Sequence, residues 1–152
     1  METLHPQYIA GFVDGEGSFH IAIYKDGQMK TGLKIIPEFH VSQRVSSKDV
    51  LEGLIGFFGC GYLKENHSAN KKDKTFVYVV RNRQDLLKTI IPFFNKYSLK
   101  TEKQKDFILF AKVVEMMQAG EHRNPAGIKK ILQLAYQMNQ GGRYRRKKHL
   151  LI

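Results

Sequence analysis

Residues 9–17 read IAGFVDGEG, and this stretch predicts a short helix that ends where a β-strand begins. Pro6, just before it, suits the first turn of a helix, where a missing N–H costs nothing. Gly17 suits the helix end. Gly11 and Gly15 are four residues apart and therefore share one helix face. Small residues at that spacing let two helix backbones approach closely, so this face is predicted to pack against a second helix.

Two strands are predicted after this helix, over residues 18–24 and 33–43, with a turn at Asp26-Gly27 between them. Polar residues occupy most of the alternate positions that the apolar residues leave. The apolar residues of the two strands are Phe19, Ile21, Ile23, Ile35, Phe39 and Val41. Such alternation is typical of an antiparallel pair with one face packed and the other open to solvent.

The rest of the chain continues the series of helices and strands. Ser46 resembles a helix start, and Gly59 suits the end of that helix. The later predicted segments are two strands at 61–65 and 74–80, a helix over 84–94 that Pro92 bends or ends, a helix capped by Thr101 and reaching Met117, and a helix from Asn124-Pro125 to Met138. The order αββαββα with a further helix indicates one α+β domain over residues 1–152, including a basic tail at 141–152.

The charge balance narrows the possible partners. The chain has 152 residues, 25 Lys and Arg against 14 Asp and Glu, and a formal net charge of +11. Such an excess favours a polyanion. Nucleic acid is preferred over an acidic membrane surface, because no strongly amphipathic basic helix is evident. A basic protein kept soluble by its charge is the plain alternative.

Cysteine content and hydropathy bear on the compartment. Cys60 is the single cysteine, which excludes an intrachain disulfide and favours a reducing, intracellular setting. It is expected to be a packing residue rather than a nucleophile. No apolar run reaches membrane-spanning length, and the first residues lack the features of a secretion signal. Bacterial or archaeal cytoplasm and an organelle both fit these features.

The stretch at 9–17 resembles the LAGLIDADG motif of homing endonucleases, and the order of elements resembles that family through about residue 138. The resemblance implies an α+β fold in which helices back a four-stranded antiparallel, saddle-shaped sheet. It also implies a sequence-specific endonuclease that hydrolyses double-stranded DNA with a divalent metal, as in intron homing. Glu16 stands where many members carry Asp, and it keeps the carboxylate with one more methylene.

The candidate catalytic residues follow from the motif and from the register of the resemblance. Glu16, at the helix end, is expected to bind Mg²⁺ together with the backbone carbonyl of Gly15, and Mn²⁺ or Ca²⁺ would suit the same ligands. Such a cation stabilises the negative charge that develops during phosphodiester hydrolysis. By resemblance, Gln43 positions solvent and Lys103 lies close to the scissile phosphate. Asp14, the other acid of the motif, is interpreted as structural.

The polar positions of the predicted strands are expected to face DNA, because a two-stranded ribbon fits the major groove. The residues nominated for this surface are Ser18, His20, Tyr24, Lys34, Glu38, His40, Ser42, Lys64, Asn66, Lys74 and Tyr78. The residues nominated to contact phosphates are Arg143, Arg145, Arg146 and Lys147. An ordinary solvated sheet face is the alternative for the first set, and Lys100 and Lys105 are alternatives to Lys103.

One motif per chain predicts a homodimer, because cutting both DNA strands calls for two active centres. A two-fold dimer favours a long, quasi-palindromic target. The expected interface is formed by Ala10, Gly11, Val13, Asp14 and Gly15. Two alternatives use the same scaffold: an RNA-splicing cofactor (maturase) and a DNA-binding regulator that no longer cuts. A basic ribosomal protein would explain the charge but not the motif.

Overall fold

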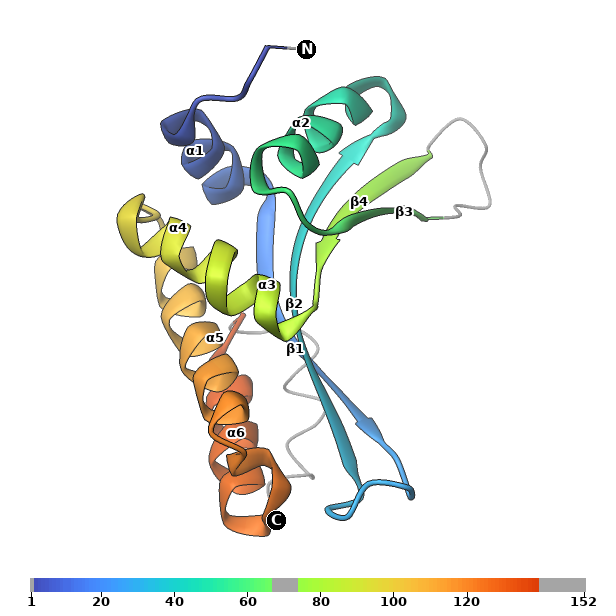
Figure 1. Cartoon of the computed structure of the whole chain (residues 1–152), viewed down its shortest axis with the longest axis vertical. Coiled ribbons are helices and arrows are strands. Elements are labelled where there is room, and N and C mark those ends of the chain that lie inside the picture. The colour runs from blue at the N-terminus through green and yellow to red at the C-terminus, as the bar shows by residue number, and fades with distance from the viewer. Residues whose placement is uncertain (1, 67–73, 140–152) are drawn as a thin grey trace. The chain divides into compact units, whose positions relative to one another are not determined.

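The motif helix is present as α1 (Pro6–Glu16) in the computed structural model (Figure 1). The side chain of His5 caps its start by accepting a hydrogen bond from the N–H of Gln7 at 3.3 Å. Gly17 ends the helix by donating its backbone N–H to the carbonyl of Val13. A Cβ at Gly17 would lie 2.7 Å from Cγ1 of Val13, so this close approach requires glycine.

Four strands form one sheet, in the order β1-β2-β4-β3. Their bounds are Gly17–Lys25 for β1, Leu33–Arg44 for β2, Tyr62–Asn66 for β3 and Thr75–Val80 for β4. β4 is antiparallel to both of its neighbours, with Val79 opposite His40 of β2 and Tyr62 of β3. The predicted four-stranded antiparallel sheet is confirmed, and its strands closely match the predicted ranges.

The helix α2 (Lys48–Phe58) follows β2 after a short 3₁₀ turn, η1 (Val45–Ser47). Its N-cap is Ser47 rather than the predicted Ser46, and the Ser47 side chain makes no capping hydrogen bond. Gly59 ends the helix as predicted, with a left-handed φ of 66° that glycine adopts without steric cost. α2 packs against β3 and β4 (Figure 1).

The predicted helix over 84–94 is distorted in its middle rather than ended. It consists of α3 (Arg83–Asp85), a π-helical turn η3 (Leu86–Ile90) and α4 (Ile91–Lys96). The N–H of Ile91 donates to the carbonyl of Leu86, five residues back. Pro92 has no N–H to donate, and its ring would crowd the preceding turn of a regular α-helix. The wider π turn therefore accommodates Pro92 within a helix that continues.

Three helical elements complete the described chain: α5 (Lys103–Gln118), the 3₁₀ turn η4 (Glu121–Arg123) and α6 (Pro125–Gln137). Asn124 caps α6 as predicted, its side chain accepting a hydrogen bond from the N–H of Gly127 at 2.9 Å. The cap predicted at Thr101 is wrong, because Glu102 is the N-cap of α5 and the Thr101 hydroxyl bonds elsewhere. Neither these helices nor any other described helix is long and apolar enough to cross a membrane.

The structure describes residues 2–66 and 74–139, which form two compact units that interleave along the chain. Unit 1 comprises the residues up to Ser18 together with Phe39–Thr101. Unit 2 comprises Phe19–Glu38 together with the residues from Glu102 onward. The prediction of a single domain stays a prediction.

Each unit has an aromatic core of its own. In unit 1, the rings of Phe39 and Phe58 lie 6.1 Å and 6.4 Å from the ring of Tyr78, centroid to centroid. In unit 2, the ring of Phe19 lies 5.3 Å from Phe107 and 5.2 Å from a second phenylalanine of α5, Phe110. The apolar alternation of the first two strands thus supplies side chains to both cores.

Candidate functional site

The predicted metal ligand lies at the exposed end of α1. Glu16 is the last residue of the helix, and both Glu16 and Gly15 are exposed. The final carbonyl groups of a helix have no partner within it, and the helix dipole makes this end partially negative. A carboxylate placed beside such carbonyls is a set of oxygen donors that fits a hard divalent cation.

Asp14, the other acid of the motif, is bound within its own unit. Its carboxylate accepts a hydrogen bond from the backbone N–H of Lys100 at 2.7 Å. It also accepts from the N–H of Thr101 at 3.2 Å and from the Thr101 hydroxyl at 2.5 Å. These bonds fix residues 100–101 to the end of α1. They agree with the structural role predicted for Asp14, and they explain why Thr101 does not cap α5.

The two glycines inside the motif helix lie on an open face of α1. A Cβ at Gly11 or at Gly15 would meet no atom within 4 Å. Tyr8, three residues before Gly11 and therefore on the same side, is 49% exposed. Its ring stacks on Phe12 with the centroids 5.8 Å apart. Close packing among the described residues thus does not explain the glycines, and this part of α1 has room for a second helix.

The opposite face of α1 is packed into the core, where Ile9 and Val13 are both 0% exposed. The prediction that Val13 lines a dimer interface is therefore wrong. Val13 follows Ile9 by four residues and shares its buried face. Ala10 is half-buried and borders an open pocket of about 410 Å³, together with Gly11 and Tyr97.

The other two predicted catalytic residues lie in different units. Gln43, in unit 1, is the penultimate residue of β2, is half-buried, and lies opposite Phe76 of β4. The Nζ of Lys48 lies 5.1 Å from the centroid of the Phe76 ring and 2.9 Å from the carboxylate of Glu52. Gln43 and Lys48 therefore share Phe76 as a neighbour. Lys103, in unit 2, is the first residue of α5 and is half-buried.

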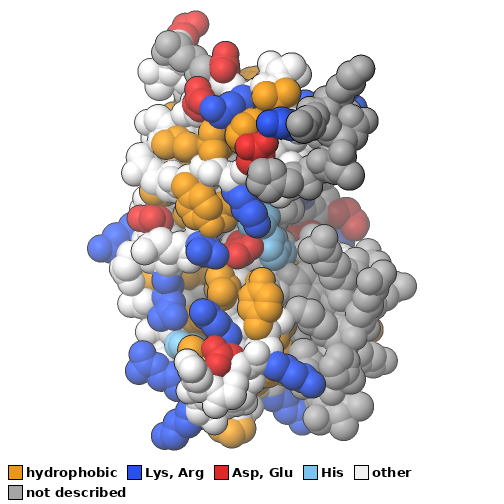
Figure 2. Space-filling view, turned by 90° about the vertical axis from the view of Figure 1, so that its right-hand side faces the viewer, with side chains coloured by type: hydrophobic (Ala, Val, Ile, Leu, Met, Phe, Trp, Pro, Cys, Tyr) orange, Lys and Arg blue, Asp and Glu red, His pale blue; other side chains and the backbone are white. Residues whose placement is uncertain are grey.

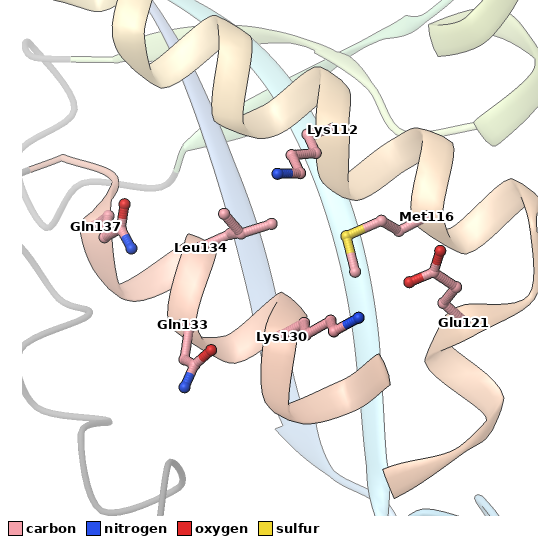
Figure 3. A pocket seen from close by; sticks show the side chains of 7 residues that line it. All are labelled: Lys112, Met116, Glu121, Lys130, Gln133, Leu134 and Gln137. Atoms are coloured by element: carbon pink, nitrogen blue, oxygen red, sulfur yellow. The ribbon is translucent and has the colours of Figure 1, made fainter. Parts of the chain in front are cut away.

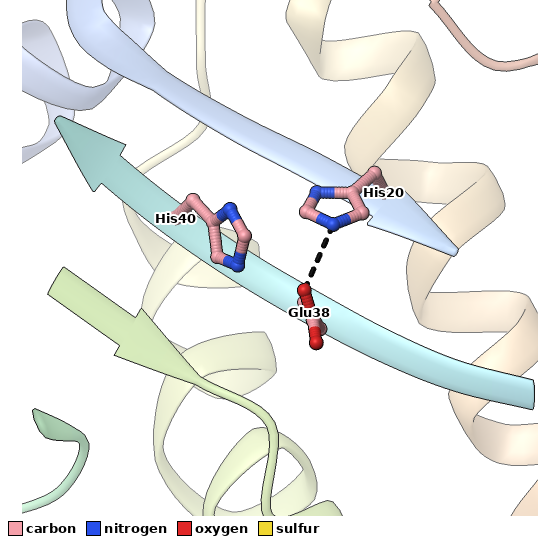
Figure 4. Close-up of side chains that lie close together, drawn as sticks. All are labelled: His20, Glu38 and His40. Carbon is pink, nitrogen blue, oxygen red and sulfur yellow. Dashed lines mark hydrogen bonds and ion pairs between the residues drawn. The ribbon is translucent and has the colours of Figure 1, made fainter. Parts of the chain in front are cut away.

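The predicted alternation of β1 and β2 is confirmed. The six apolar residues of the two strands are all buried. The polar set of Ser18, His20, Tyr24, Lys34, Glu38, His40 and Ser42 is half-buried or exposed. His20 and Glu38 connect the two strands on this polar side, with Nε2 of His20 2.9 Å from Oε2 of Glu38 (Figure 4).

Three cross-strand rows of side chains lie on the face of β2, β4 and β3 opposite to α2. Directly opposite residues of paired strands share a face. Tyr78 and its partner residues occupy the other face, where Tyr78 stacks on Phe58 of α2. The rows, called here the open rows, are His40–Val79–Tyr62, Ser42–Val77–Lys64 and Arg44–Thr75–Asn66. None of these nine residues is acidic. Lys64 and Asn66 are exposed, as a DNA-contacting role requires.

Of the four residues nominated around β3 and β4, two lie off the open rows. Tyr78 is 0% exposed, and its hydroxyl donates to the carbonyl of Cys60 at 3.0 Å, so the prediction that it contacts DNA is wrong. Burial raises the pKa of Tyr78 and keeps the phenol protonated. Lys74 precedes Thr75, alternates to the other face, and pairs with Glu65 at 3.1 Å. The nominated Arg143, Arg145, Arg146 and Lys147 lie outside the described residues.

The thiol of Cys60 fits a packing role. Cys60 is half-buried, and burial is the main cause that raises the pKa of its thiol. A raised pKa disfavours the thiolate, which is the reactive form. Nothing in this environment therefore suggests nucleophilic chemistry at Cys60.

Tyr62 and Arg81 are exposed residues of this face that the sequence interpretation did not nominate. Tyr62 is 41% exposed, and the guanidinium carbon of Arg81 lies 5.8 Å from the centroid of its ring. Tyr62 alternates with Lys64 and Asn66, and this alternation was a signal that would have found it. Arg81 lies just beyond β4, where no pattern marks it.

The described part of the face in Figure 2 has no single patch of cationic side chains. Figure 2 shows Lys and Arg side chains spread among acidic and apolar ones over the described part of the face that it draws. A hollow between α5 and α6 (Figure 3) is lined by Lys112, Met116, Lys130 and Leu134 among others. It contains none of the predicted catalytic residues, so the candidate site is assigned to α1 and the open rows.

The model of the LAGLIDADG endonuclease family matches residues 9–114, which is more than half of the chain. The chain therefore belongs to this family. It is 38% identical to the homing endonuclease I-TnaI, whose crystal structure it matches with a TM-score of 0.88 over 99% of this chain and 100% of that one. It is 37% identical to the homing endonuclease I-SmaMI bound to cleaved DNA, with a TM-score of 0.87 over 98% of this chain and 49% of that one.

Among proteins known by sequence, a Neurospora crassa protein named probable intron-encoded endonuclease 2 is 30% identical over 139 residues. The match covers 91% of this chain and 30% of that protein. The chain thus spans less than two thirds of the length of several curated relatives that it matches.

Proposed function

We propose that the chain is a sequence-specific endonuclease that cuts double-stranded DNA with the help of a divalent cation. The observation that carries this proposal is the end of α1, where the exposed carboxylate of Glu16 follows the carbonyl of Gly15. Membership of the LAGLIDADG endonuclease family supports it. So does the likeness to I-SmaMI, which is known bound to cleaved DNA and bound to an uncleaved target in the presence of calcium ions.

Glu16 and the carbonyl oxygen of Gly15 would hold Mg²⁺, because both are accessible and both are hard oxygen ligands. When bound, the cation offsets negative charge on the phosphate and makes water a stronger acid. The amide of Gln43 would orient the attacking water, and the ammonium of Lys103 would stabilise charge that develops on the phosphate oxygens. Asp14 is not assigned to the chemistry, since its carboxylate is already engaged by Lys100 and Thr101.

The open rows and the polar side of the β1–β2 pair would contact DNA. They combine hydroxyl, amide, imidazole and cationic groups, which suits the mixed donors and acceptors of base edges in the major groove. A DNA-contacting face disfavours acidic residues, and the open rows of β2, β4 and β3 have none. A solvated sheet face without function would not need to exclude them. This surface would therefore supply sequence preference, while the overall positive charge supplies affinity.

The active unit would be a homodimer that pairs two copies of α1. The chain offers one motif helix, and the open face at Gly11 and Gly15 leaves space for close helix contact. The exposed Tyr8 would extend that contact. Such an interface is isologous, so the target would be approximately two-fold symmetric.

A cleavage assay on a plasmid library with random inserts tests this function. The purified protein is incubated with the library and Mg²⁺, and the cut ends are sequenced. Cuts at one recurrent, quasi-palindromic sequence are expected, and chelation of the metal should abolish them. A mock purification from cells without the gene controls for contaminating nuclease. Cutting that ignores sequence, or that persists in the chelator, would contradict the proposal.

A further inference from the structure

We propose that Arg81 reads a guanine base and that Tyr62 is the residue that positions its guanidinium. This inference rests on the proposed function and deepens it, because it names residues that would decide which DNA sequence is bound. Neither residue belongs to the motif, and neither is required to hold a metal. The argument depends only on β3, β4 and the residue that follows β4.

Arg81 and Tyr62 are held next to each other by the pairing of their strands. Tyr62 lies opposite Val79, so Arg81, two residues beyond Val79, is its diagonal neighbour. The guanidinium carbon lies 5.8 Å from the centroid of the Tyr62 ring, within the range of a cation–π contact. Both side chains are exposed. Solvent therefore reaches the pair, and so would a ligand on the same side.

The contact restricts the orientation of the guanidinium. Arginine loses rotamer freedom when it binds, and a flat aromatic ring beside it removes part of that freedom in advance. A planar fork of N–H donors that is already oriented matches the O6 and N7 atoms of guanine, which lie side by side on one base edge. A phosphate group requires a less specific geometry of its cationic partner than guanine does. A mobile lysine can therefore bind a phosphate as well as an oriented arginine can.

The surroundings of the pair favour a polyanion rather than an acidic protein side chain. Arg81 lies at one end of the open rows, which include Arg44 and Lys64 and no acidic residue. Glu65 of β3 is directed to the other face, where it pairs with Lys74. Asp85, four residues after Arg81, lies in α3, and its charge acts on the buried Tyr78 of that other face. A two-stranded ribbon such as β3–β4 fits the major groove, where guanine presents O6 and N7.

Selection from a pool of duplexes with a randomised central segment tests the assignment without cleavage. The full chain is incubated with the pool and Ca²⁺, and bound duplexes are sequenced. The same selection is run with Arg81→Ala, Arg81→Lys, Tyr62→Ala and Tyr62→Phe. Lys88→Ala, which removes an exposed cation from η3, is the matched control. Thermal melts verify that every variant is folded before it is used.

The unaltered protein is expected to select a motif with a guanine at one position of each half-site. Arg81→Ala should lose that guanine by about 5- to 150-fold and keep the rest of the motif. Arg81→Lys should lose it too, because lysine lacks the fork. Tyr62→Ala should weaken the same preference, whereas Tyr62→Phe should keep it, since only the ring is used. Lys88→Ala should select the parental motif.

Two results would overturn the roles given to Arg81 and Tyr62 without contradicting the proposed function. One is a parental motif from Arg81→Ala. The other is a uniform loss of affinity for all sequences with a smaller salt dependence, which would mean that Arg81 contacts a phosphate. Failure of the unaltered protein to select any motif would overturn the proposed function, and this assignment with it.

Discussion

The two faces of α1 place opposite demands on the sequence. On the packed face, Ile9 and Val13 are 0% exposed, and a Cβ at Gly17 would lie 2.7 Å from Val13. On the open face, a Cβ at Gly11 or Gly15 would meet nothing within 4 Å. The small residues of one nine-residue stretch thus serve two purposes. Gly17 is required by the packing of its own chain, whereas no described residue packs closely against Gly11 or Gly15, which leaves space for the proposed dimer contact.

Removing the charge of Glu16 should have the largest effect on the open side. Glu16→Gln keeps the shape but weakens metal binding, so cleavage of the identified target should fall by about 100- to 1,000-fold. The unfolding temperature should not change, because the side chain is exposed. Glu115→Gln, at an exposed glutamate of α5, is the control and should cut normally. Parental cleavage rates for Glu16→Gln in Mg²⁺ would remove Glu16 from the site.

On the packed side, Ile9→Ala should act on the fold instead. Deleting most of a fully buried side chain leaves a cavity and should cost about 3 kcal/mol of unfolding free energy. Urea unfolding measures this loss. Cleavage per folded molecule should stay close to parental. A stable Ile9→Ala protein that fails to cut would mean that the two faces of α1 are not separable.

Gly11→Leu should sharpen the contrast between the faces. The new side chain has space in a single copy, and leucine is a better helix former than glycine by about 0.5–1 kcal/mol. The monomer should therefore fold. Between two copies of α1 the leucine side chain would clash with the partner helix. The clash should reduce the free energy of dimerisation by about 1–3 kcal/mol, which weakens self-association by roughly 5- to 150-fold. Sedimentation measures the association. A Gly11→Leu protein that dimerises like the parent would place the interface elsewhere.

The smallest effect on stability is expected inside the sheet. There the buried Tyr78 of β4 and the exposed Tyr62 of β3 show the same contrast between a packed and an open face. Tyr78→Phe removes the hydrogen bond to the Cys60 carbonyl and should cost about 1 kcal/mol at neutral pH. Burial raises the pKa of Tyr78 above its ordinary value of 10.0. The unfolded chain therefore releases this proton first as pH rises, and the parent loses stability above pH 10.

Phenylalanine has no proton to release, so the difference between parent and Tyr78→Phe should shrink above pH 10. Urea unfolding at pH 7 and at about pH 10.5 measures both differences. The exposed Tyr62 offers the comparison, because Tyr62→Phe should leave stability nearly unchanged at either pH. A gap between parent and Tyr78→Phe that grows with pH would contradict the burial argument.

Much of the fold could be predicted because the relevant signals are local. Alternating polarity predicted β1 and β2, and the left-handed φ at Gly59 needs the residue that the sequence provides. The π turn before Pro92 could not be predicted in that way. Its position depends on which carbonyls the continuing helix can still satisfy, and a proline alone indicates only that some distortion follows.

For the candidate site, an acid or a glycine marks exposed positions of α1, and the roles given to them stay predictions. The outward-facing residues of the sheet were harder to predict. β4 reads TFVYVV, in which Thr75 is followed by no alternating polar residue that would mark the outer face along the strand. Tyr78 was therefore assigned to the wrong side, and only the strand register, with Tyr78 opposite Val41 and Leu63, corrects it. Val13 was misassigned for a related reason. An apolar residue in a motif looks the same whether it faces a partner or its own core.

The valines at the centre of the open rows affect how the sequence of such a protein can change during evolution. Val77 and Val79 are 5% and 3% exposed, so the centre of the face is closed by valine whichever side chains flank it. The flanking residues of β2 and β3, such as Ser42 and Lys64, are exposed and add little to the core. Exchanges at such surface positions usually alter stability by no more than about 0.5 kcal/mol. If these residues contact DNA as proposed, a lineage can replace them one at a time and come to bind a new target while the fold persists.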